Sequence, residues 1–247
     1  MNSRLFFYLV KLPKVAIFIF FVFVIIAGLL HPGEQNDKIN FESEHYSITH
    51  NFLSQLGSVE VAFHNEINGD YKVSNLPSLL LFASAVSLIG FSMVMFYLNF
   101  EKLFLMVGDT KKALKFSKFT KPIGVVAGVM FAGVGLVPHD FNFYLHIFFA
   151  HGAFLMLWVV SILHLCAIHN SKYIANKYSI GYIVFCVLLF FYLLLIFFGP
   201  KVGPHIMYLE KDLVLQVVSQ KFIVLAFIFS ILIQIFGLNK ILKTSKK

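Results

Sequence analysis

Long apolar runs alternate with polar connections along this chain. Six of the runs cover approximately residues 15–30, 77–99, 123–137, 145–168, 180–198 and 214–238. About 20 apolar residues are enough to cross the hydrocarbon core of a bilayer as a helix, and a helix in lipid satisfies its own backbone hydrogen bonds. The pattern therefore predicts an all-α integral membrane protein, with six transmembrane helices forming a single domain over residues 1–247.

Two connections are longer than the others. In the loop 31–76, Ile48, Phe52 and Leu56 recur every four residues between Ser47, which suits a helix N-cap, and Gly57, which suits a helix end. This spacing predicts a short amphipathic helix on the membrane surface or over the mouth of the bundle. The connection 101–122 holds six lysines among apolar residues, which indicates a cytoplasmic segment in contact with anionic lipid headgroups.

The charge distribution predicts an orientation. When the N-terminus is placed inside, 15 of the 20 basic residues fall on the cytoplasmic side, namely Arg4 and Lys11, 14, 102, 111, 112, 115, 118, 121, 172, 177, 240, 243, 246 and 247. Ten of the twelve acidic residues then fall outside. The positive-inside rule therefore places both termini in the cytoplasm. This asymmetry and anionic headgroups account for the net charge of +8, so no nucleic-acid partner is expected.

Composition supports the same class, because 59% hydrophobic residues and a mean hydropathy of +0.82 do not fit a water-facing surface. Within the run 123–137, Gly124, Gly128 and Ala132 recur every four residues. Small residues on one face allow membrane helices to approach closely. We therefore expect this helix to lie centrally in the bundle.

The candidate chemistry centres on Pro138, His139, Asp140 and His146. Asp140 is the only acidic residue between Asp109 and Glu210, and the short connection around it makes the flanking helices antiparallel neighbours. We expect Asp140 to reach His146. A carboxylate beside an imidazole can tune a general base, it can supply metal ligands together with His139, or it can simply pin two helix ends.

Further polar residues belong to the same predicted site. The candidate ligand-binding residues are His50, Ser54, His139, Asp140, His146 and His151. His151 lies about 7.5 Å deeper than His146 and about 140° around the helix, so the two do not face one small ligand. His151 and His164 share one helix, whereas bis-histidine haem ligation needs a facing helix. Haem is therefore not favoured, and the sequence identifies no other cofactor.

Three segments resemble a known family. NFLSQLG at 51–57, NLPSLLLF at 75–82 and GVGLVPHD at 133–140, followed by His146, are similar to the motifs of the prokaryotic six-helix membrane family catalogued only as domain of unknown function 998. The layout is more distantly similar to Frag/DRAM/Sfk-type membrane proteins. Gln55 stands where the family has an acidic residue. The resemblance implies a multi-pass protein of a prokaryotic cytoplasmic membrane, in which segment 54–57 and turn 138–146 meet at one outer mouth.

The leading hypothesis for function is that the protein binds or passes a lipid or small hydrophobic ligand at the outer leaflet, or has a structural role in the envelope. One alternative is a membrane-embedded hydrolase or transferase acting on lipid headgroups, with Asp140 and His146 as base or metal ligands and Ser54 or water as nucleophile. A second alternative is an ion-coupled carrier that uses His151 or His164. The oligomeric state does not follow from the sequence.

Overall fold

The computed structural model describes residues 3–65 and 69–244. The chain is mostly helical, as predicted. Within the described residues, six helices are long and apolar enough to cross a membrane, covering Ser3–Leu30, Leu76–Val107, Lys111–Leu136, Phe143–His169, Asn176–Phe198 and Glu210–Lys243. The prediction of a multi-pass helical membrane protein is therefore confirmed in its coarse form. Lys246 and Lys247, which contribute to the predicted charge asymmetry, lie outside the described residues.

The first crossing is built from α1 (Ser3–Phe6), a π-helical turn (Phe7–Lys11) and α2 (Leu12–Leu30). Pro13 is the second residue of α2 and directly follows the π-helical turn; because proline has no N–H, it cannot donate the helical hydrogen bond at this point. The other crossings are α3 (Leu76–Val107), α4 (Lys111–Leu136), α5 (Phe143–His169), a 3-10 turn (Asn176–Ser179) that leads into α6 (Ile180–Phe198), and α7 (Glu210–Thr244).

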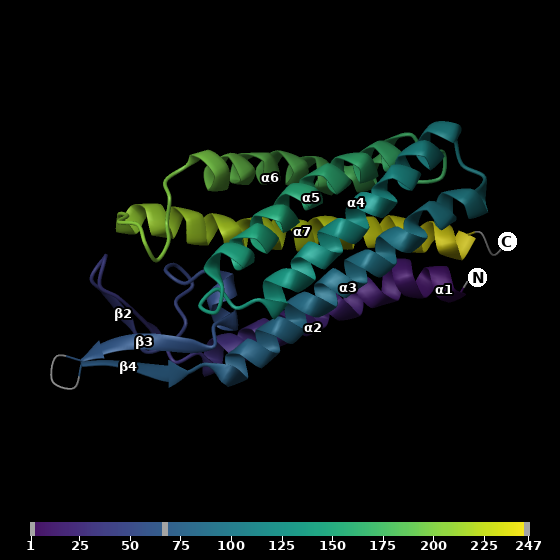
Figure 1. The fold of residues 1–247 in the computed structure, drawn as a ribbon. Coiled ribbons are helices and arrows are strands. Elements are labelled where there is room, and N and C mark those ends of the chain that lie inside the picture. The colour runs from purple at the N-terminus through teal and green to yellow at the C-terminus, as the bar shows by residue number, and fades with distance from the viewer. Residues whose placement is uncertain (1–2, 66–68, 245–247) are drawn as a thin grey trace.

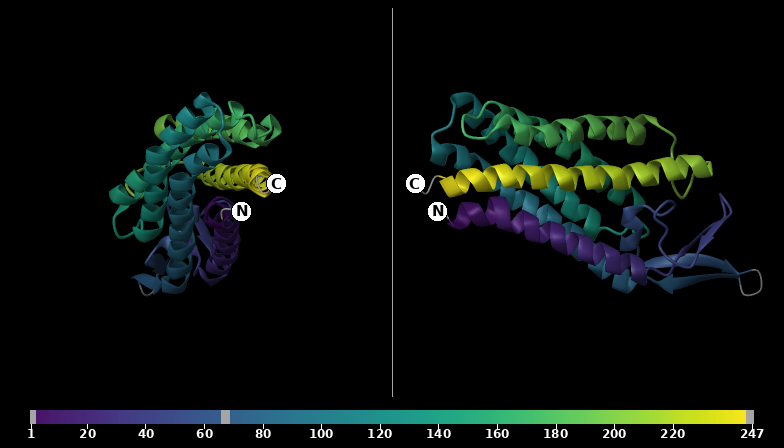
Figure 2. Two further views of the ribbon diagram at one scale, coloured as in Figure 1. Left: turned by 90° about the vertical axis from the view of Figure 1, so that its right-hand side faces the viewer. Right: turned by 180° about the vertical axis from the view of Figure 1, so that it is seen from behind.

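The helices pack in chain order. Each of α2 to α7 contacts the next one along the chain, and α7 returns to the Phe7–Lys11 turn. Both termini lie at one end of the bundle, which we call the terminal end, and the strands lie at the other, the strand end (Figure 1). Toward the strand end, α2 and α7 diverge (Figures 1 and 2). The ring of helices is thus closed by α7 at the terminal end and left wider at the strand end.

The connection 101–122 differs from the predicted loop. It is helical except at Gly108–Thr110, because α3 extends to Val107 and α4 begins at Lys111. Gly108 adopts a left-handed conformation (φ 64°), which ends α3, and the Thr110 hydroxyl accepts the Ala113 N–H at 3.0 Å as the N-cap of α4. Five of the six lysines therefore lie in the first turns of α4, and Lys102 lies near the end of α3, so they do not form a separate segment.

The loop 31–76 contains strands that the all-α prediction did not include. β1 (Glu34–Asn36) pairs with β2 (Phe41–Ser43), and β3 (Glu60–Asn65) pairs with β4 (Gly69–Ser74), each as an antiparallel hairpin. The expected helix over 47–57 is replaced by a turn at 48–50 and a 3-10 helix, Leu53–Gly57. Tertiary hydrogen bonds to this segment, described below, replace those of a continuous helix.

Glycine brings α3 and α4 into backbone contact. A Cβ added at Gly128 would lie 2.6 Å from the Gly90 carbonyl oxygen and 3.0 Å from the Val94 nitrogen, and a Cβ at Gly90 would overlap the Gly128 carbonyl oxygen. Gly124 is covered by the Tyr97 ring in the same way. The predicted small-residue face of α4 is thus confirmed, and α4 packs between α3 and α5.

Candidate ligand-binding cavity

An apolar cavity lies inside the bundle, toward the strand end. Side chains from all six crossings line it, including Phe20 of α2, Val86 of α3, Phe131 of α4, Ala153 of α5 and Phe227 of α7. Its unoccupied space is about 860 Å³, counting the part that is open to the outside.

Polar side chains gather at one end of this cavity. Ser54, His146 and Gln220 line it beside Leu53, and the remaining lining side chains are apolar. From His146 to Leu157, the cavity follows α5 for about 16 Å at 1.5 Å per residue. This depth matches one leaflet, which is about half of a hydrocarbon core of about 30 Å. The cavity therefore has the amphipathic profile of a membrane lipid, with a polar end and an apolar shaft.

Residues 47–57, which we call the cap segment, cover the polar end. The Leu53 N–H donates to Gln220 Oε1 at 2.8 Å, and the Lys221 ammonium donates to the Asn51 carbonyl at 2.5 Å. At the start of α7, His50 Nε2 lies 3.0 Å from the Glu210 carboxylate, and the His50 ring stacks on Phe41. The first turns of α7 thus hold one side of the cap segment.

The start of α3 holds the other side. The Asn75 amide donates to the carbonyls of Leu56 and Ser58 at 3.2 and 3.0 Å, and the Ser78 hydroxyl donates to Leu56 O at 2.9 Å. The Phe82 ring lies directly on Gly57, where a Cβ would be 2.5 Å from ring carbon Cδ1. Glycine is needed at position 57 for this close contact. The sequence pattern had interpreted Gly57 only as the end of a helix.

Glu34, the first residue of β1, bonds to side chains of the cap segment. Its carboxylate accepts hydrogen bonds from the Asn51 amide and, at 2.8 Å, from Gln55 Nε2. Burial raises the pKa of Glu34 to about 7, and the two amide donors oppose that rise. Gln55 is therefore suited to this position, because an acidic residue there would face the Glu34 carboxylate.

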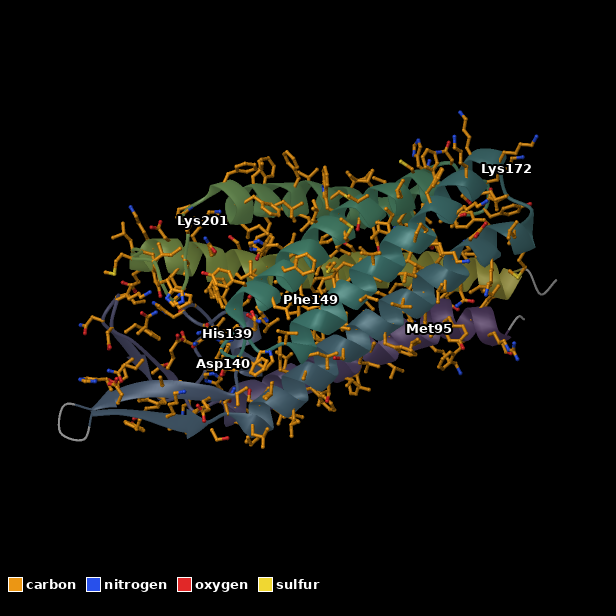
Figure 3. All side chains as sticks on the ribbon, viewed as in Figure 1. Met95, His139, Asp140, Phe149, Lys172 and Lys201 are labelled. Carbon is orange, nitrogen blue, oxygen red and sulfur yellow. The ribbon has the colours of Figure 1, made fainter. Side chains whose placement is uncertain are left out.

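Asp140 contacts the loop 31–76 rather than His146. One carboxylate oxygen accepts the backbone N–H groups of Val59 and Glu60 at 2.8 and 3.0 Å, where β3 begins. Figure 3 shows Asp140 and His139 between the helices and the hairpins. The expected contact of Asp140 with His146 is wrong, because the carboxylate is turned outward to the loop backbone. Asp140 thus fixes the loop 31–76 to the connection between α4 and α5, rather than pinning two helix ends together with His146.

Removing the Asp140 carboxylate is expected to loosen the loop 31–76. In Asp140→Ala, two backbone N–H groups lose a charged acceptor, which costs about 1–3 kcal/mol. Limited proteolysis should then cut residues 31–76 several times faster than in the parent protein. Asp140→Asn keeps an acceptor oxygen and should recover most of the protection. Equal proteolysis of Asp140→Ala and the parent protein would contradict this role.

His146 is the histidine that faces the cavity. It is buried, and its Nδ1 lies 2.7 Å from the Val137 carbonyl oxygen. A carbonyl only accepts, so Nδ1 carries the hydrogen and the lone pair of the neutral ring is on Nε2. His146 is thus fixed in one tautomer with a hydrogen-bond acceptor available to a ligand.

His139 lies near His146, and His31 lies near His139. The His139 ring is 6.0 Å from the His146 ring, and burial lowers the pKa of His139 to about 4, with His146 and His31 lowering it further and Asp140 raising it. Burial likewise lowers the pKa of His31 to about 4, and its Nδ1 accepts the Gly33 N–H at 3.2 Å. Both rings are therefore neutral near pH 7.

The metal candidates His139, Asp140 and His146 do not surround one point. Asp140 is committed to the loop backbone, and His146 Nδ1 to Val137. Across residues 3–65 and 69–244, no three His, Cys, Asp or Glu side chains are grouped closely enough to hold a metal ion. The donor arrangement thus favours hydrogen bonding over metal ligation.

The remaining candidate histidines lie elsewhere. His151 is not among the lining residues and contacts Phe197 of α6, with ring centroids 5.3 Å apart. Its turn away from His146 agrees with the predicted angle around α5. His164 is fully buried nearer the terminal end, stacked between Phe100 and Tyr182. Neither histidine shares the cavity mouth.

Comparisons with protein-family models, curated proteins and solved structures find no match for this chain. The cavity is therefore interpreted from its own chemistry. Sequence analysis identified Ser54 and His146 but missed Gln220, Glu34 and Asn51. Gln220 and Lys221 interrupt an otherwise apolar run, which is a signal that could have pointed to α7. Glu34 and Asn51 stand in a polar loop and carry no such signal.

Proposed function

We propose that the protein binds a lipid or a small hydrophobic ligand from the outer leaflet of a prokaryotic cytoplasmic membrane. The observation that carries the proposal is the cavity, which is apolar along its length and polar at one capped end. Ligand sites are typically concave and mostly apolar, with a few polar groups that fix orientation. The tail would lie along α5 and the head beneath the cap segment.

The proposed orientation places the strand end outside and both termini in the cytoplasm. The charge asymmetry supports it, since most basic residues lie at the terminal end, including Lys172 (Figure 3). The lysines of the first turns of α4 are exposed and would then meet anionic lipid headgroups. Membership of the family catalogued as domain of unknown function 998 stays a prediction.

Binding is favoured over hydrolysis of lipid headgroups. A hydroxyl nucleophile is normally activated by a base within hydrogen-bonding reach. Ser54 and His146 both line the cavity, but no hydrogen bond joins them among the described residues, and Asp140 does not orient His146. The arrangement presents separate polar groups to a ligand rather than an assembled catalytic pair.

Filling the cavity is the direct test of this function. Ala153 is fully buried on α5 and lines the shaft, so in Ala153→Phe a ring should occupy the ligand's space. We expect co-purified lipid, extracted and counted by mass spectrometry, to fall from about one molecule per protein to a small fraction of that. Leu155→Phe is the matched control. Leu155 lies two residues away on α5 but does not line the cavity, and 37% of its side-chain surface is exposed on the outside of the bundle.

The outcome separates binding from simple lipid coating. Lipid that coats the bundle should be retained equally by Ala153→Phe and Leu155→Phe, and such a result would count against the cavity as a binding site. Gel filtration and thermal unfolding of both variants check that the fold is kept.

A further inference from the structure

The polar end of the cavity is uncharged. The polar side chains that line it are those of Ser54, His146 and Gln220, and no lining residue is Asp, Glu, Lys or Arg. Two ionisable groups lie next to this end without lining it, and both bond to the cap segment: Lys221 to the Asn51 carbonyl and Glu34 to the amides of Asn51 and Gln55. Asp140 is bound to the backbone of Val59 and Glu60. A charged headgroup would therefore be desolvated here without an oppositely charged lining residue beside it, which is costly.

The three groups offer a defined set of donors and acceptors. His146 has its Nδ1–H directed to Val137 and offers Nε2 as an acceptor. Gln220 uses its oxygen to accept the Leu53 N–H, which fixes the amide assignment and leaves its two N–H groups as donors. The Ser54 hydroxyl can donate or accept. One acceptor and two donors fit a head that contains a hydroxyl and a carbonyl or ether oxygen.

The available space indicates the size of the ligand. One water, a single non-hydrogen atom, occupies about 30 Å³ of liquid, so about 860 Å³ corresponds to at most about 29 non-hydrogen atoms. A glycerol ester with one long acyl chain has about 25 such atoms, whereas a two-chain phospholipid has about 50, so this upper limit admits at most one chain.

We propose that the cavity takes a single-chain amphiphile whose head is uncharged and carries a hydroxyl group, of the monoacylglycerol kind, in preference to lipids with phosphate heads. The inference rests on the proposed function, because it names the ligand class of the same cavity. The ligand hydroxyl donates to His146 Nε2, and oxygens of the head accept from Ser54 and Gln220. The acyl chain follows α5 toward Leu157.

The test compares three probes on the full-length protein in detergent, with native mass spectrometry as the readout of binding. The probes are monooleoylglycerol, its phosphate-bearing analogue oleoyl lysophosphatidic acid, and its dimethyl ether, which lacks hydroxyl groups. We expect monooleoylglycerol to bind at least about tenfold more tightly than the phosphate-bearing probe and about five- to tenfold more tightly than the ether, which is the effect of one hydrogen bond.

A pair of variants tests the role of His146. His146→Asn keeps an N–H donor for Val137 but removes the Nε2 acceptor, so its affinity for monooleoylglycerol should fall about five- to tenfold while its affinity for the ether is unchanged. His151→Asn is the matched control on the same helix, because His151 contacts Phe197 instead of the cavity. It should leave both affinities unchanged.

The possible results distinguish the inference from the function on which it rests. If the phosphate-bearing probe binds as tightly as monooleoylglycerol, or if both histidine variants weaken all probes equally, the inference on the head group is overturned while cavity binding stands. If none of the probes binds and Ala153→Phe retains as much lipid as the parent protein, the proposed function itself fails. The comparison of probes on the parent protein needs no variant, so it holds even if His146→Asn does not fold.

Discussion

Replacing Gly90 with alanine is expected to destabilise the folded protein by about 3 kcal/mol, the upper range for overpacking a tight interface. The added Cβ would overlap the Gly128 carbonyl oxygen and lie 2.8 Å from the Ala132 nitrogen. Both are backbone atoms of α4, so no side-chain rotation can relieve the contact and the two helices must move apart. Thermal unfolding of the purified protein in detergent measures the effect.

Gly28→Ala is the matched control for Gly90→Ala. Gly28 also lies within a membrane helix, but a Cβ there meets only Tyr46 Cδ1 at 3.8 Å, an ordinary contact. We expect this variant to be as stable as the parent or more stable by up to about 1 kcal/mol, because alanine favours a helix more than glycine does. If both variants unfold at the same temperature, the close packing of α3 on α4 is not a principal source of stability.

The Glu34→Gln variant is expected to gain stability of the cap segment over the parent protein as the pH rises. The difference in free energy of opening should grow by about 3 kcal/mol between acidic and alkaline pH. The pKa of Glu34 rises from 4.5 to about 7 because the group is buried. Between these values the folded state holds a proton that the open state has lost, so stability falls as pH rises through the window, by about 1.4 kcal/mol per unit of pKa shift. Glutamine does not ionise and removes this loss.

His31 and His139 act in the opposite direction in the parent protein. Burial lowers both pKa values from 6.5 to about 4, so the open state binds more protons between those values and stability rises with pH there. Their effect is common to the parent and to Glu34→Gln, and it cancels when the two are compared at the same pH. The difference between the two proteins therefore isolates Glu34, and above pH 6.5 Glu34 alone of these three groups still titrates.

Hydrogen–deuterium exchange of residues 47–57 at a series of pH values measures this difference, because it reports local opening of the cap segment. Comparison at equal pH also removes the intrinsic pH dependence of exchange. Glu44→Gln is the matched control, since Glu44 is an exposed carboxylate in the same loop, and its difference from the parent should not change with pH. A pH-independent difference for Glu34→Gln as well would show that Glu34 does not hold a proton when the cap segment is closed.

Sequence reasoning succeeded where the signal is local or is set by the bilayer. The six apolar runs correspond to six helices because a spanning segment must satisfy its own backbone hydrogen bonds, whatever its neighbours are. The small-residue face of α4 predicted a close helix contact for a similarly general reason. The angle between His146 and His151 follows from helix geometry alone, and the structure directs one to the cavity and the other to Phe197.

The same reasoning failed where long-range contacts decide the local structure. Ser47 to Gly57 has the spacing of an amphipathic helix, yet α3 and α7 supply hydrogen-bond partners that hold it as a turn and a 3-10 helix. Asp140 and His146 are close in sequence, yet Asp140 bonds to residues about 80 positions earlier. Residues such as Gln220 and Glu34 acquire their roles only through partners that no spacing rule connects to them.

The sequence by itself therefore determined the class of the protein, its number of crossings and two of the cavity's polar residues, because hydrophobic length and helix periodicity depend on neighbouring positions only. The tertiary structure alone decided that α2 and α7 diverge, that residues 47–57 form a turn and a 3-10 helix over the cavity, and that no Asp, Glu, Lys or Arg lines the polar end beneath them. Those features arise from packing between distant segments, where shape and hydrogen-bond partners select one arrangement.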